Sequence, residues 1–214
     1  MWIERTRELY ERAIYAGDDD ALTEADRDLD AAEAALALAR GRTLHGRFLT
    51  DGRADPRELT LFEQATRLHR ALGDRRGEGE SLFWEGCYHQ LVRGDLDAAA
   101  PLFERSRELA AKAGDHATLA EALRHLGILA HRAGRLDEAR ESLTESSRLR
   151  REMGLWAGVA SNQVGLIYIA VAQGRHDDAR ALADEARALA ESCGADRIRT
   201  QVEEARAAIP GHAP

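Results

Sequence analysis

Apolar residues recur along most of the chain with the three- and four-residue spacing that is typical of amphipathic helices. Ala99, Leu102 and Phe103 fall on one such face, and the same spacing returns at Ala139 and Leu143. The pattern predicts an all-α fold. The expected helices span residues 2–16, 20–49, 56–72, 77–93, 96–113, 116–133, 136–153, 156–173, 176–193 and 195–208.

A repeat of about 40 residues groups these helices into antiparallel pairs. The copies align without a gap at a 40-residue offset over 93–115, 133–154 and 173–194, and an earlier copy spans 51–74. Gly94, Gly134 and Gly174 coincide where the first helix of each pair must end. We expect one domain over 1–214, made of an N-terminal helix (1–16), four helix-pair repeats (20–194), a capping helix (195–208) and a tail (209–214) that frays.

The repeat resembles the tetratricopeptide repeat family, in a long form similar to the helical arrays of actinobacterial regulators. The resemblance covers roughly residues 36–208. The small residue that this family carries midway along each first helix is matched by Gly46, Gly86, Gly127 and Gly165. The resemblance implies a right-handed α-solenoid with about four repeats plus terminal helices. It also implies that the first helices line a concave groove that holds a peptide or a partner protein.

Aligning the first helices on these glycines places a mixed strip of side chains on the concave face. The candidate ligand-binding or partner-binding residues are Arg47, Trp84, Cys87, Gln90, Arg124, His125, His131 and Asn162. The strip suits a peptide or a polar small molecule, and a solvated groove without a specific ligand is the alternative. An aromatic residue such as Trp84 also has the spacing of one that packs against a neighbouring helix pair.

Three polar residues stand where other repeats carry apolar core residues. Glu85 takes the place of Leu126 and Val164, and His89 lies one turn further on the same face. We expect Glu85 and His89 to be partly buried together, with His45 approaching from the adjacent repeat. The cluster is either a structural pair that anchors helices, or a general acid/base pair, or a three-ligand site of the kind that zinc uses.

Composition excludes several classes of function. The net charge of −8 disfavours nucleic acid and anionic membranes as partners. The chain has no apolar stretch of signal-peptide or membrane-span length, which predicts a cytoplasmic protein. Cys87 and Cys193 lack metal-ligand spacing, and the only lysine, Lys112, is not in a phosphate-binding loop. We therefore expect no cofactor and no metal.

The absence of a known catalytic motif favours a non-enzymatic interaction scaffold that binds a peptide or partner protein in its groove. The alternative is a small-molecule sensor or an enzyme of a biosynthetic pathway. Its site would combine His45, Trp84, Glu85, His89, Arg124 and His125. A homodimer is compatible with either function, because repeat arrays expose apolar surface at uncapped ends. The N-terminal helix is the expected dimer contact or packed cover, through Trp2, Ile3, Leu9, Tyr10 and Ile14.

Overall fold

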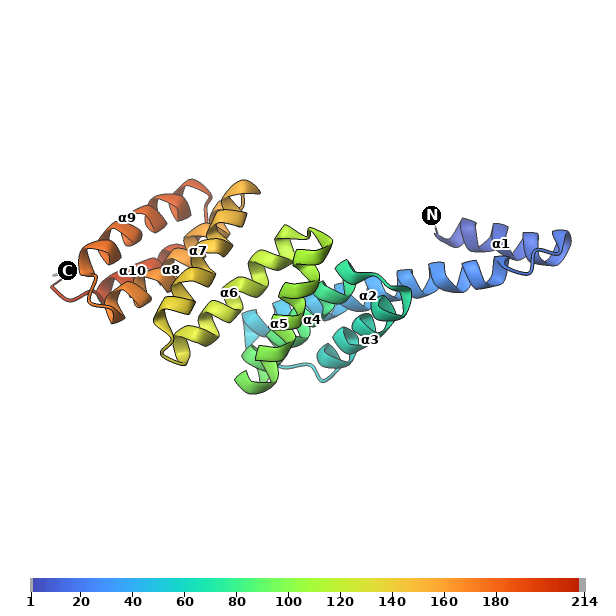
Figure 1. Ribbon diagram of the computed structural model, residues 1–214, viewed down its shortest axis with the longest axis horizontal. Coiled ribbons are helices and arrows are strands. Elements are labelled where there is room, and N and C mark those ends of the chain that lie inside the picture. The colour runs from blue at the N-terminus through green and yellow to red at the C-terminus, as the bar shows by residue number, and fades with distance from the viewer. Residues whose placement is uncertain (1, 212–214) are drawn as a thin grey trace. The chain divides into compact units, whose positions relative to one another are not determined.

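The computed structural model describes residues 2–211, which form helices joined by short turns (Figure 1). The helices are α1 (Trp2–Ala16), α2 (Ala21–Asp51), α3 (Arg57–Leu72), α4 (Arg75–Cys87), a π-helix η1 (Tyr88–Arg93), α5 (Leu96–Ala113), α6 (His116–Arg132), α7 (Leu136–Glu152), α8 (Trp156–Ala172), α9 (His176–Ser192) and α10 (Asp196–Ala207). The all-α fold of successive helix pairs is confirmed.

The chain divides into two compact units, residues 1–114 and 115–214. In the first unit α2 packs on α3 and α4 on α5, while α3 joins the two pairs and α1 lies against α2. In the second unit α6 packs on α7 and α8 on α9, and α10 closes the unit against α8 and α9. The expectation of a single domain over 1–214 stays a prediction.

Polar caps fix where several helices begin. The side chains of Asp74, Asp95 and Asp115 each accept a hydrogen bond from the backbone N–H three residues later, at the start of α4, α5 and α6. The helices before these turns end in left-handed glycines, such as Gly94 (φ 67°) and Gly114 (φ 66°). A glycine that ends one helix, followed by an aspartate that caps the next, can be recognised in the sequence. The helix bounds therefore lie close to those predicted.

A glycine in the first helix lets each helix pair of unit 1 close tightly. A Cβ atom added to Gly41 would lie 2.4 Å from a ring carbon of Phe62, and one added to Gly86 would lie 2.6 Å from a ring carbon of Phe103. Gly46, by contrast, has no atom within 4 Å of such a Cβ. The sequence alignment on Gly46 was therefore wrong, because Gly41 is the residue that faces the second helix.

The C-terminal end packs further than expected. Ile209 is 2% exposed and belongs to a core cluster with Val202 and Ala205. Fraying is therefore wrong for Ile209, because α10 turns its side chain into unit 2, while residues 212–214 lie outside the described part of the chain. Within residues 2–211, no helix has the length and apolar character needed to cross a membrane.

Candidate functional site

A groove runs along α2 in the first unit, and we call it the first-helix groove. It consists of two adjoining cavities of about 610 and 240 Å³ that share Ala35, His69 and Asp74. The remaining lining residues are Glu24, Arg27, Asp28, Ala31, Leu38, Ala39, Arg42, Leu72, Arg76, Gly77 and Glu80. Alanines of α2 therefore form one wall, and charged side chains of both signs surround it.

A cation and an aromatic ring lie together at the Arg42 end of this groove. The guanidinium of Arg42 lies 5.3 Å from the centre of the Trp84 ring, and Nη1 donates a 3.0 Å hydrogen bond to Oε1 of Glu80. Trp84 is half-buried, and its inner edge packs with Phe62 and the other apolar residues of the α2–α4 seam. Such a cation–π contact holds the long Arg42 side chain over the groove.

A buried histidine lies on the opposite wall. His69 is 8% exposed, and its Nδ1 atom lies 3.0 Å from a carboxylate oxygen of Asp74. Within residues 2–211, neither ring nitrogen of His69 has a hydrogen-bond partner of good geometry. Gly77 makes room for the ring, because an added Cβ there would lie 2.2 Å from Nδ1. Nδ1 of His69 therefore lies at ion-pair distance from Asp74, and Nε2 is a buried ring nitrogen that has no hydrogen-bond partner among residues 2–211.

Three predicted groove residues are buried instead. Cys87 is 2% exposed, Gln90 is 4% exposed and Asn162 is fully buried, so their assignment to a binding surface is wrong. The cause in α4 is the direction of Gly86, which faces α5. Cys87 at the end of α4 and Gln90 in the following π-helix η1 are both buried on the packed side of this helix pair.

Arg47 is exposed but lies elsewhere. It lines a separate cavity of about 670 Å³ between α2 and α3, which we call the α2–α3 pocket. The other residues of this pocket are Arg40, Thr43, Leu44, Pro56, Arg57, Thr60 and Leu61. Arg42, five residues before Arg47, takes the groove position, as the shift from Gly46 to Gly41 requires. The contact of Gly41 with a large aromatic residue was the missing signal.

The comparisons with known proteins agree with this architecture. Residues 87–152 match the family model of the tetratricopeptide repeat. This stretch carries tetratricopeptide-like helical repeats. Repeats of this kind generally mediate protein–protein interaction.

Similarity to individual proteins is more distant. No curated protein matches the sequence. Among solved structures, the crystal structure of BtubC (BKLC) from P. vanneervenii is similar, with 17% sequence identity and a TM-score of 0.45. The match covers 88% of this chain and 94% of that one.

In unit 2, polar candidates bind one another. Arg124 donates from Nη1 to the Ser161 carbonyl oxygen (2.9 Å) and to Oδ1 of Asn162 (2.8 Å). The Asn162 amide donates in turn to Oγ of Ser146 and Ser147. These bonds join α6, α7 and α8, so these contacts of Arg124 and Asn162 hold the repeats together.

Burial has an electrostatic consequence for the same cluster. Loss of solvent around Arg124, and secondarily the nearby positive charge of Arg150, lowers the pKa of Arg124 to about 10. One carboxylate, that of Glu121, lies near both arginines. Its Oε2 atom lies 2.7 Å from Nη2 of Arg150. The remaining candidates of this unit, His125 and His131, are half-buried on α6.

Glu85 does not pair with His89, so that expectation is wrong. Within residues 2–211, the Glu85 carboxylate accepts a hydrogen bond from the Thr66 hydroxyl of α3. The expected spacing fails because α4 ends at Cys87 and the chain continues as the wider π-helix η1, in which residues four apart no longer stack.

His45 is engaged by a different acid from the one expected. Its Nδ1 atom lies 2.8 Å from Oε1 of Glu58 in a buried hydrogen bond between α2 and α3. His45 and Glu85 are therefore engaged by different partners on α3 and do not converge on one site. No group of three or more His, Cys, Asp or Glu side chains in the described residues is placed to hold a metal ion.

Proposed function

We propose that this chain is a protein-interaction scaffold that binds a segment of a partner protein in the first-helix groove. The observation that carries the proposal is the groove itself, with small residues on the α2 wall and the charged or polar side chains of His69, Asp74 and Glu80 opposite. Interaction through helical repeats is the general role of such folds.

The side chains of the groove indicate what the segment would look like. Ala31, Ala35 and Ala39 are exposed or nearly so at the wall and have no side chain beyond Cβ, so a partner's helix or strand can approach α2 closely. Because the rim carries both signs of charge, we expect a segment of mixed charge with one apolar residue directed toward Trp84 and Arg42.

The test uses a photo-crosslinking amino acid at Ala39 in the full chain, expressed in the source cells. We expect it to capture one specific protein. The variant Ala35→Arg, which fills the groove with a long side chain, should lose that product. Ala111→Arg is the matched control, because Ala111 is an exposed alanine of α5 outside the groove.

Equal capture by the wild type, Ala35→Arg and Ala111→Arg would refute the groove as the binding site. Capture of no protein, together with a metabolite that raises the melting temperature, would favour the small-molecule function instead.

A further inference from the structure

The outer side of α1 and α2, opposite the first-helix groove, exposes a band of large apolar residues. Six side chains are each between 40% and 55% exposed, and we call this surface the outer face. Its residues are Ile3, Tyr10 and Ile14 of α1 and Leu22, Leu29 and Leu36 of α2. Side chains of this size are seldom exposed in such a continuous group unless the surface is covered by a partner.

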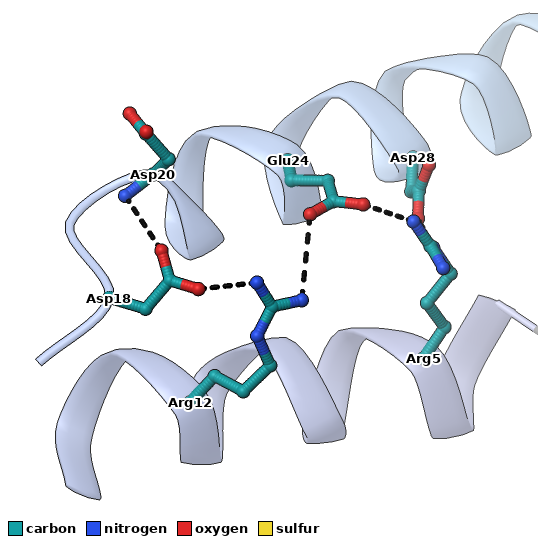
Figure 2. A network of polar contacts seen from close by, with 6 residues as sticks. All are labelled: Arg5, Arg12, Asp18, Asp20, Glu24 and Asp28. Atoms are coloured by element: carbon teal, nitrogen blue, oxygen red, sulfur yellow. Dashed lines mark hydrogen bonds and ion pairs between the residues drawn. The ribbon is translucent and has the colours of Figure 1, made fainter. Parts of the chain in front are cut away.

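The packing of α1 on α2 places these six residues on one surface. Figure 2 shows that Arg5 and Arg12 of α1 reach the carboxylates of Glu24 and Asp28 on one side of the α1–α2 contact. Leu9 is buried within the contact, together with Ala21 and Ala25 of α2. The apolar residues of both helices lie on the other side of this buried seam, as the helical angle of 100° per residue requires.

On this face of α2, an acidic residue lies toward the N-terminal end of the helix and basic residues lie toward its C-terminal end. Asp26 lies within the leucine stripe, whereas Arg40 and Arg47 continue the same stripe toward the C-terminal end of α2 and line the α2–α3 pocket. Within residues 2–211, none of these three side chains forms a salt bridge or a hydrogen bond, although most arginines of the chain are paired. The face thus presents an acidic end at Asp26 and a basic end at Arg40 and Arg47, where the Asp55 carboxylate interacts with Arg47 only at longer range.

We propose that a second copy of this chain covers the outer face, with the two α2 helices antiparallel. Antiparallel pairing about Glu33 brings Asp26 opposite Arg40 of the second copy, and it places Leu29 within one residue of the position opposite Leu36 of the second copy. It also brings Leu22 into the α2–α3 pocket of the second copy, beside Leu44. The two-fold symmetry makes every contact twice, as in an isologous dimer.

The spacing of the charges supports a second copy as the occupant. Asp19, in the turn before α2, and Asp26 are seven residues apart, and so are Arg40 and Arg47. A partner that pairs with Arg40 and Arg47 therefore needs two acidic residues seven apart, with an apolar residue between them. The start of α2 in a second copy has this arrangement in Asp19, Leu22 and Asp26. Glu33 lies at the centre of the pairing, where it would face Glu33 of the second copy. Its carboxylate accepts a hydrogen bond from Gln64 of α3, which holds it toward α3 and away from the two-fold axis of the dimer.

The proposal is independent of the proposed function, because the groove and the outer face lie on opposite sides of α2. Its first test is the mass of the full chain in solution, measured by light scattering and sedimentation. We expect a dimer for the wild type and a monomer for Leu29→Glu. Leu155→Glu should remain dimeric, because Leu155 is exposed to a similar degree (47%, against 40% for Leu29) but lies in unit 2.

Charge reversal tests the register. Asp26→Arg and Arg40→Asp should each weaken the dimer about tenfold or more, since like charges then face each other twice. The double variant Asp26→Arg/Arg40→Asp should regain the wild-type dissociation constant. All four residues that are changed in these tests are on the surface, and circular dichroism verifies that each variant is folded.

Two results would overturn the dimer. The first is a wild type that stays monomeric at concentrations on the order of 100 μM, well above the dissociation constants of stable dimers. The second is a double variant that is no tighter than either single one. Binding of an unrelated acidic helix by a monomeric chain would assign the outer face to another partner and would also reject the proposal.

Discussion

Two glutamates of unit 1 lie inside the protein with only part of their hydrogen-bonding capacity used. Glu58 is fully buried and Glu85 is 9% exposed. Burial raises the pKa of both carboxyl groups, and the hydrogen bonds from His45 and Thr66 oppose that rise without cancelling it. Each charged carboxylate therefore costs free energy near neutral pH.

Replacing Glu85 with Gln should stabilise the protein at neutral pH. The native pKa of Glu85 lies above its unfolded value, so its contribution to stability is greatest below the unfolded pKa and falls as the pH rises through the native one. Gln keeps an oxygen that accepts from Thr66 and carries no charge. We expect a gain on the order of 1 kcal/mol at pH 7, and no difference at about pH 4.

Urea denaturation at the two pH values measures this effect. A Glu85→Gln variant that is less stable than the wild type at pH 7, and equally stable at about pH 4, would show that the charged carboxylate is favourable where it lies.

His45→Ala should have the opposite effect on stability. It leaves Glu58 buried without its hydrogen-bond partner, which costs about 3 kcal/mol for a buried charged group left unpaired. The double variant His45→Ala/Glu58→Gln removes the charge as well and should recover part of the loss. Thermal unfolding of the three proteins tests this, and a double variant less stable than His45→Ala would contradict it.

At the scale of the helices, two glycines of similar sequence context should respond in opposite ways. Gly86→Ala places a Cβ 2.6 Å from the Phe103 ring, so α4 and α5 must separate, at a cost of about 1–3 kcal/mol. Gly46→Ala meets no atom within 4 Å in the interior of α2 and should stabilise by up to about 1 kcal/mol.

Chemical denaturation of both variants measures the contrast. If Gly46→Ala proved as destabilising as Gly86→Ala, the assignment of Gly41 as the packing glycine would be refuted.

The bounds of the helices could be predicted from the sequence. Which side of each helix packs inward could be predicted only in part. Apolar periodicity and Gly-Asp turns fix helix bounds locally, and the observed α5 coincides with the predicted 96–113. Which of two glycines five residues apart faces Phe62 depends on tertiary packing. The choice of Gly46 placed Arg47 in the groove in place of Arg42.

The polar contacts between neighbouring helices of unit 1 could not be predicted from the sequence either. Glu85 was expected beside His89 from helical spacing alone, whereas its actual partner, Thr66, lies on another helix. The π-helix that begins at Tyr88 gave no signal in the apolar pattern. Partners between repeats depend on how the helices cross, which one sequence without structure does not determine.

At the scale of the whole molecule, the 31-residue helix α2 contributes to two surfaces. Its alanines line the first-helix groove, and its leucines line the outer face on the other side. If the outer face joins two copies, each dimer carries two grooves. A partner with two binding segments would then bind more tightly than one segment alone, through a raised effective concentration.

Dimerisation through the outer face predicts that thermal stability depends on protein concentration. Because association favours the folded state, the melting temperature of the wild type should rise as the protein concentration is raised. Leu29→Glu should melt at one temperature over the same range, and the exposed control Leu155→Glu should follow the wild type. Scanning calorimetry over a hundredfold range of concentration measures this, and a wild-type melting temperature independent of concentration would count against the dimer while leaving the first-helix groove untouched.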